Sequence, residues 1–147
     1  MFDVDDIMGQ ESEEMSTEYV LVPEGEWEGQ AQAPVVRKTQ GVKDPTATYY
    51  FLDVPFEISD PMVLKEMNRE NAAVARFSSI LDLTTEGKID SAEGKNVKLG
   101  RLREAMGLNS AGFKLPDLEG GLCRVKVKHD TGKDGITRSP VIDATTL

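Results

Sequence analysis

The clearest chemical pattern in the sequence is an alternating run near the C-terminus. Arg124, Lys126 and Lys128 are separated from one another by single valines. In an extended strand, alternate side chains lie on one face, about 7 Å apart. Cations at this spacing suit the phosphates of an extended polynucleotide, so the pattern favours binding to a polyanion. The alternative is an exposed face kept soluble by lysines, or an edge strand protected against pairing.

More basic residues surround this run in the C-terminal third of the chain. The segment from Lys95 to Arg138 holds ten basic residues against five acidic ones. This excess strengthens the polyanion interpretation, because nucleic-acid-binding surfaces are basic. The candidate contacts outside the run are Lys98, Arg101, Lys114, Lys133 and Arg138.

Two aromatic residues form the second chemical pattern. The run from Tyr49 to Ile58 alternates, which predicts a strand with one buried face. Tyr49 and Phe51 share the other face, where aromatic rings offer a stacking surface to any nucleic-acid base. The alternative is that this face packs beneath a loop. Trp27 has small apolar neighbours, and we expect it in the core instead.

Motifs for catalysis or for metal binding are incomplete. Residues 82–93 resemble the calcium loop of an EF-hand, but Gly94 follows where the exit helix should continue, so we favour a polar turn. The sequence lacks a phosphate-binding loop and the common hydrolase motifs. Cys123 and His129 are the only residues of their types, too few for a Cys/His zinc cluster. We therefore expect a protein that is not an enzyme and has no cofactor or metal.

Charge is distributed unevenly along the chain. The formal net charge is −9, yet residues 1–28 hold ten acidic residues and no Lys or Arg. The remaining residues carry 16 acidic and 17 basic side chains. Residues 1–18 are acidic and lack hydrophobic periodicity, and such a composition is typical of a segment that stays disordered. We therefore predict an acidic flexible arm, residues 1–18, and one nucleic-acid-binding domain, residues 19–147.

The expected elements of this domain follow from local patterns. Asp60 and Pro61 predict the start of a short helix, as an N-cap followed by proline. Apolar residues at helical spacing, followed by Gly107, predict the main helix over residues 96–106. Residues 73–83 read as a strand, although their first residues could equally begin a helix. The other strands are expected at 27–36, 49–58, 122–128 and 136–144.

This order of elements suggests an architecture. A five-stranded barrel with its helix between strands 3 and 4 has the OB topology, a common platform for oligonucleotides. We therefore predict a mainly β, five-stranded OB-like barrel with an additional short helix. A β-sandwich or another small α+β fold is compatible with the same order.

The chain resembles a family of small tailed-phage proteins from early replication or recombination regions. The resemblance covers roughly residues 19–145, and residues 94–105 are its most specific part. It implies an OB-fold protein that binds single-stranded DNA without strong sequence preference. The chain departs from the family at residues 141–144, where family members have a V-x-G-type segment. The resemblance is carried by residues 22–27, 81–84, 94–105 and 124–128.

The expected partner is single-stranded DNA, bound during phage DNA replication or recombination in the host cytoplasm. Residues 2–8 resemble the acidic tails with which single-stranded DNA-binding proteins recruit replication and recombination proteins, although those tails are C-terminal. The arm could instead cover the protein's own basic groove. No apolar run approaches the roughly 18 residues that a membrane span needs. The alternative function is a phage virion structural or accessory protein with a small β-rich domain.

Overall fold

Twelve short elements make up the chain, and the computed structural model describes all residues, 1–147. The barrel strands are β1 (Gly25–Ala31), β3 (Thr48–Ile58), β4 (Ala73–Ile80), β5 (Leu122–Val127) and β8 (Val141–Thr145). The helices are α1 (Val4–Met8), α2 (Pro61–Glu66), α3 (Val97–Ala105) and a 3₁₀ helix, Leu115–Leu118. The remaining strands are β2 (Val35–Gln40), β6 (Asp130–Thr131) and β7 (Thr137–Arg138).

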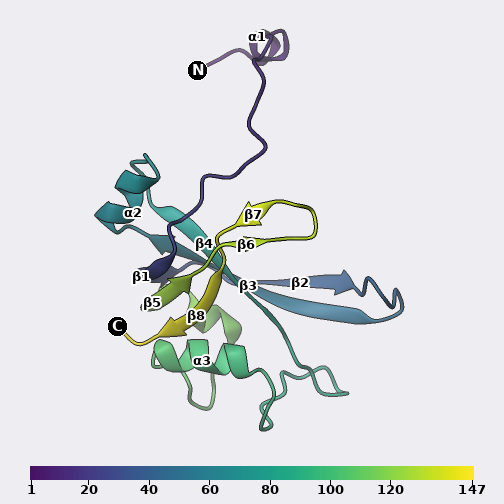
Figure 1. Ribbon diagram of the computed structural model, residues 1–147. Helices are drawn as coiled ribbons and strands as arrows, with labels where there is room; N and C mark the ends of the chain where they lie inside the picture. The colour runs from purple at the N-terminus through teal and green to yellow at the C-terminus, as the bar shows by residue number, and fades with distance from the viewer.

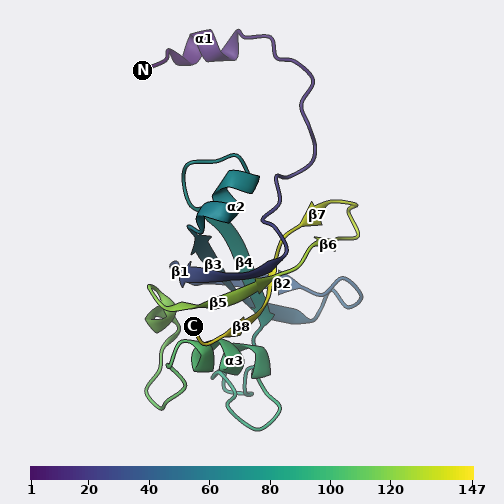
Figure 2. The same ribbon diagram turned by 60° about the vertical axis from the view of Figure 1, so that its left-hand side comes forward.

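Hydrogen-bonded pairing closes five of these strands into a barrel (Figure 1, Figure 2). The order around the barrel is β1-β5-β8-β4-β3, and a second pairing of β1 with β3 completes the closure. Only β4 and β8 run parallel to each other. Because α3 lies between the third and fourth barrel strands, this is the OB topology. The predicted mainly β, OB-like barrel is confirmed.

One parity of residues from each strand fills the barrel. On β3, Leu52, Val54 and Phe56 are 0% exposed, and Val125 of β5 is equally buried. The alternation predicted for both strands is therefore confirmed. Trp27 packs against this core, as expected, and its Nε1 donates to the Pro23 carbonyl oxygen at 2.9 Å.

A glycine permits the close approach of β1 to the core. A Cβ atom at Gly29 would lie 3.1 Å from Val125 Cγ1 and 3.2 Å from Phe56 Cδ1, tighter than ordinary van der Waals contact. A larger residue there would require the Val125 and Phe56 side chains to shift by a few tenths of an ångström, next to Gln30 and Ala31, where β1 pairs with β3.

The main helix, α3, covers one end of the barrel, below β8 in Figure 1. Leu99 and Leu102 are buried beneath it, as their spacing predicts. Asn96 precedes the helix with a left-handed φ of 49°. Its side-chain nitrogen donates to the carbonyl oxygens of Asp82 at 2.9 Å and Asp90 at 2.8 Å. These bonds close the loop between β4 and α3 at its neck.

Two other local predictions are confirmed. The Asp60 carboxylate accepts a hydrogen bond from the Met62 backbone N–H at 2.9 Å, and α2 begins at Pro61. Residues 73–83, which could have begun a helix, form a strand that ends at Ile80.

Two predicted strands are wrong in extent, because each is interrupted at a proline. The predicted strand 27–36 divides into β1 and β2 around Pro34, which has no N–H to give to a ladder. The predicted strand 136–144 divides into β7 and β8 at Pro140 for the same reason. As a consequence Val35, which one continuous strand would place on the same face as Trp27, is 57% exposed on β2.

Two hairpins leave the barrel on the same side (Figure 1, Figure 2). β2 pairs with the first half of β3, and the two strands form a hairpin, called here the β2–β3 hairpin, that extends beyond the barrel. β6 pairs with β7 in the connection between β5 and β8. In OB barrels, the loops at these two positions flank the face of the second and third strands, where oligonucleotides bind. Here those strands are β3 and β4.

The N-terminal segment extends away from the barrel, with α1 at its far end (Figure 1). All residues from Met1 to Val20 are exposed. At the base of the segment, the Arg138 guanidinium lies 5.8 Å from the centroid of the Tyr19 ring. None of the helices has the length and apolar character to cross a membrane.

Deleting residues 1–18 is expected to leave the melting temperature unchanged, because none of these side chains is buried. Thermal unfolding followed by circular dichroism, on the parent and on protein that begins at Tyr19, measures the difference. A lower melting temperature in the shortened protein would show that the arm packs on the barrel.

Candidate nucleic-acid interface

The outward residues of β2, β3 and β4 form one continuous face, here called the platform. The strand register aligns these residues in rows. Arg37, Phe51 and Ile80 form one row. The platform consists of Val35, Arg37, Tyr49, Phe51, Asp53, Pro55, Arg76, Ser78 and Ile80.

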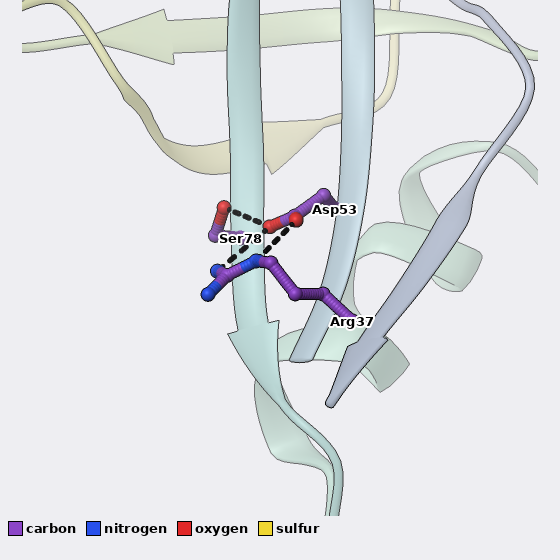
Figure 3. A network of polar contacts seen from close by, with 3 residues as sticks. All are labelled: Arg37, Asp53 and Ser78. Atoms are coloured by element: carbon purple, nitrogen blue, oxygen red, sulfur yellow. Dashed lines mark hydrogen bonds and ion pairs between the residues drawn. The ribbon is translucent and has the colours of Figure 1, made fainter. Parts of the chain in front are cut away.

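A polar network joins the three strands of the platform (Figure 3). Arg37 Nε donates to Asp53 Oδ2 at 2.9 Å, and Ser78 Oγ donates to Asp53 Oδ1 at 2.6 Å. The Asp53 side chain is 10% exposed, whereas that of Arg37 is 49% exposed. A carboxylate so far removed from water requires such donors. The network therefore connects the β2–β3 hairpin to the barrel through side-chain hydrogen bonds.

The environment of Asp53 keeps its carboxylate ionised. Burial raises the pKa of Asp53, but the hydrogen bonds from Arg37 and Ser78 and the charges of Arg37 and Arg76 lower it by more. The pKa therefore lies below its ordinary value of 3.8. At neutral pH, Asp53 balances one positive charge of the platform.

Tyr49 and Phe51 lie on the platform, with the outward orientation predicted for them. The Tyr49 side chain is on the outer face of β3 and is 42% exposed. The guanidinium carbon of Arg37 lies 4.6 Å from the centroid of the Phe51 ring. This is a cation–π contact, and it leaves the planar guanidinium on the surface. The platform thus presents one exposed ring beside a ring stacked with a planar cation.

The predicted basic strand lies on a different face of the barrel. Arg124 and Lys126 are exposed on the outer side of β5, as their alternation predicts. In the register with β1, however, Glu28 lies opposite Arg124 and Glu26 lies opposite Lys126. On the other side, Asp143 of β8 lies opposite Lys126. This face carries mixed charges rather than a continuous row of cations.

Lys98 and Lys128, which are distant in the sequence, lie around one pocket. The pocket has a volume of about 280 Å³ and lies over the start of β8. Lys98 reaches it from α3, where Nζ donates to the Ser78 carbonyl oxygen at 2.8 Å. Lys128 reaches it from the end of β5. Because Ser78 belongs to the platform and lines the pocket, the two features adjoin.

The other predicted cations are dispersed. Arg101 of α3 pairs with Asp143 at 3.2 Å. Arg138 pairs with Asp134 at 3.0 Å within the β6–β7 hairpin. The remaining two, in the turn of that hairpin and directly before the 3₁₀ helix, are Lys133 and Lys114.

Sequence analysis missed three polar residues of the platform. Arg37 lies directly after the end of the predicted strand 27–36. Arg76 and Ser78 lay in a strand to which no outward face was assigned. One signal was present in the sequence: Asp53 shares the outward parity of Tyr49 and Phe51, and a carboxylate beside aromatic rings needs a cation or donor nearby.

The only cysteine and the only histidine of the chain, Cys123 and His129, make contacts within the fold. Burial raises the pKa of the Cys123 thiol to about 11, so the thiol is neutral at physiological pH. His129 Nε2 lies 2.8 Å from the Val22 carbonyl oxygen. No three His, Cys, Asp or Glu side chains are arranged to hold a metal ion. A bridge between Leu83 and Ile89 makes a turn within residues 82–93, as predicted.

Comparison with protein-family models, with curated proteins and with solved structures finds no match to this chain. The resemblance to phage single-stranded DNA-binding proteins therefore stays a prediction. A functional proposal has to be based on the barrel topology and on the side chains of its surface.

Replacing Asp53 with Asn is expected to lower the free energy of unfolding by roughly 1–2 kcal/mol at neutral pH, because charge-assisted hydrogen bonds are lost. The folded-state pKa of Asp53 is lowered, so its carboxylate stabilises the fold above the unfolded-state pKa. This contribution disappears as the pH falls through the folded-state pKa. Urea denaturation of parent and variant from neutral pH into the acid range measures the effect.

Glu57→Gln is the matched control for this experiment. Glu57 lies on the same outward parity of β3, and its side chain makes no ion pair. A loss in Asp53→Asn that is independent of pH, or an equal loss in Glu57→Gln, would contradict the role assigned to the network.

Proposed function

We propose that this protein binds single-stranded DNA on the platform, largely without sequence preference. One observation carries the proposal: in a closed OB barrel, the outer face of β3 holds an exposed Tyr49 beside Phe51 stacked with Arg37. The second and third strands of OB folds are the usual surface for oligonucleotides. Aromatic rings and guanidinium planes stack on every base, which accounts for tolerance of sequence.

The apolar surroundings of the rings favour unpaired bases as the ligand. Val35 and Ile80, which border Arg37 and Phe51 on the platform, are 57% and 50% exposed. Bases in a single strand expose faces that can bury such surface, whereas a duplex keeps its bases stacked inside. The platform therefore suits a single strand better than a duplex.

Cations beside the platform, rather than the β5 face, are proposed to contact the phosphates. Acidic side chains lie opposite Arg124 and Lys126, and they weaken the attraction of these cations for a polyanion. Arg76 lies on the platform itself, and the pocket lined by Lys98 and Lys128 adjoins it. We therefore expect Arg76, Lys98 and Lys128, rather than Arg124 and Lys126, to contact the phosphates of the DNA.

We further propose a role in phage DNA replication or recombination in the host cytoplasm. The resemblance of residues 94–105 to the phage family supports this role. The arm would recruit partner proteins of the same process: Phe2 and Ile7 are 87% and 54% exposed within an acidic segment. Apolar side chains among acids suit a partner groove that is apolar and has a basic rim.

Tyr49→Ala and Phe51→Ala are each expected to weaken binding of labelled dT oligomers by roughly 1–3 kcal/mol. The dependence of affinity on salt should be unchanged, because stacking releases no counterions. Fluorescence-anisotropy titrations at several salt concentrations, with a matched duplex for comparison, measure both quantities. Met62→Ala, an exposed apolar residue of α2, is the control. Equal affinity of the alanine variants and the parent would exclude the platform as the site, and preference for the duplex would contradict the proposed single-stranded ligand.

Deleting residues 1–18 is expected to tighten binding of dT oligomers at low salt. The deletion removes acidic side chains that repel the DNA or compete with it for the cations on and beside the platform, and salt screens this effect. The same titrations, on the shortened protein and the parent, measure the gain and its disappearance at high salt. Identical affinities at low salt would mean that the arm does not act on the DNA site.

A further inference from the structure

The pocket beside the platform brings together two lysines from separate elements, Lys98 and Lys128. It lies where β8 begins, next to its parallel partner β4. One wall belongs to β4 and α3, and the other to the end of β5 and the start of the β6–β7 hairpin. The polar lining residues are Ser78, Lys98, Lys128, His129 and Asp130.

Lys98 is held at the β4 side of this pocket. Its Nζ donates to the Ser78 carbonyl oxygen at 2.8 Å and lies 5.0 Å from the centroid of the Phe77 ring. An ammonium group has three N–H donors, so this arrangement leaves two for a ligand. The contacts to Ser78 and Phe77 restrict the side chain before any ligand arrives, which lowers the entropic cost of binding.

Lys128 stands at the other side of the pocket on a fixed backbone. Its own N–H donates to the Pro140 carbonyl oxygen at 3.3 Å. The next residue, His129, is tied through its backbone N–H to Glu24 Oε2 at 2.9 Å and through its ring to Val22. The Lys128 side chain makes no ion pair, because the three salt bridges of the structure all join other residues.

The chemistry of the lining selects a small anion. Two ammonium groups face one acidic residue, Asp130, in contrast to the β5 face, where Lys126 has acids on both sides. A volume of about 280 Å³ accommodates a phosphate group with part of its sugar. Lysine binds phosphate as a point charge and needs no fixed orientation of the ester.

We propose that this pocket holds one phosphate group of the bound single strand, a proposal that rests on the function proposed above. Ser78 makes the connection, because its Oγ donates to Asp53 on the platform while its carbonyl oxygen accepts from Lys98. A strand with bases stacked on Tyr49 and Arg37 leaves the platform over β4 and meets the pocket there. The phosphate is either an internal diester or a terminal monoester.

The test compares two double variants of the full chain that remove the same charge. Lys98→Gln with Lys128→Gln changes the pocket, and Arg124→Gln with Lys126→Gln changes the β5 face. Salt-dependent anisotropy titrations with dT oligomers measure the number of phosphates neutralised, at about 0.7 units of slope for each. We expect the pocket variant to lose about 0.7 units of slope, and the β5 variant to lose less.

The single variant Lys128→Gln controls for the possibility that loss of Lys98 disturbs the platform through Ser78. Lys128→Gln leaves the Lys98 contact with Ser78 intact, so it should weaken binding at low salt without changing the melting temperature. Oligomers with and without a 5′ phosphate distinguish the two sources of the phosphate. Tighter binding of the phosphorylated oligomer, lost in the pocket variant, assigns a terminal phosphate, whereas equal binding with a reduced slope assigns an internal one.

Two results would overturn the proposal, and they differ from each other. If the parent binds dT oligomers and both double variants lose slope equally, the pocket is no specific site, but the proposed function stands. If the parent binds no single strand at any salt concentration, the proposed function and the pocket fail together.

Discussion

Closure of the sheet between β1 and β3 is the constraint on which the other features depend. β1 pairs with β3 at only two residue pairs, and Gly29, directly before them, lacks a Cβ atom that would lie 3.2 Å from Phe56 Cδ1. In the closed barrel, one parity of β3 fills the interior, and Phe51 and Asp53 are necessarily outside. A slip of one residue would exchange the two sets. The platform is therefore the outer side of the same packing that makes the core.

Asp53 connects the barrel to the β2–β3 hairpin that extends from it. Arg37 comes from β2 and Ser78 from β4, and each donates to the same carboxylate. This acceptor adds a hydrogen bond to the cation–π contact that places the Arg37 guanidinium over Phe51. Ser78 extends the connection, since its carbonyl oxygen accepts from Lys98 at the pocket. One buried carboxylate thus positions the stacking surface and adjoins the proposed phosphate site.

Local charge, rather than net charge, decides whether a polyanion can approach this protein. The chain has a formal net charge of −9, but seven of its 26 acidic residues belong to residues 1–18, which extend away from the barrel. At physiological ionic strength, charges more than about 8 Å apart are largely screened when exposed to solvent. A DNA strand bound to the barrel as proposed would therefore respond mainly to the side chains next to it. By the same reasoning, the acids of β1 and β8 matter for Arg124 and Lys126, because they are direct neighbours.

The sequence by itself determined the strands at residues 49–58 and 122–128, their buried faces and the helix that becomes α3. Each of these depends on a period that is visible within ten or so residues. Their order favoured the OB topology, but a β-sandwich or another small α+β fold was compatible with the same order. The sequence did not determine which strands are neighbours in register. Pairing of β1 with β5 set Glu28 opposite Arg124 and turned a predicted basic row into a mixed surface. The same is true of Asp53, whose partners come from two other strands. Register across strands depends on how the whole core packs, and no local pattern carries that information.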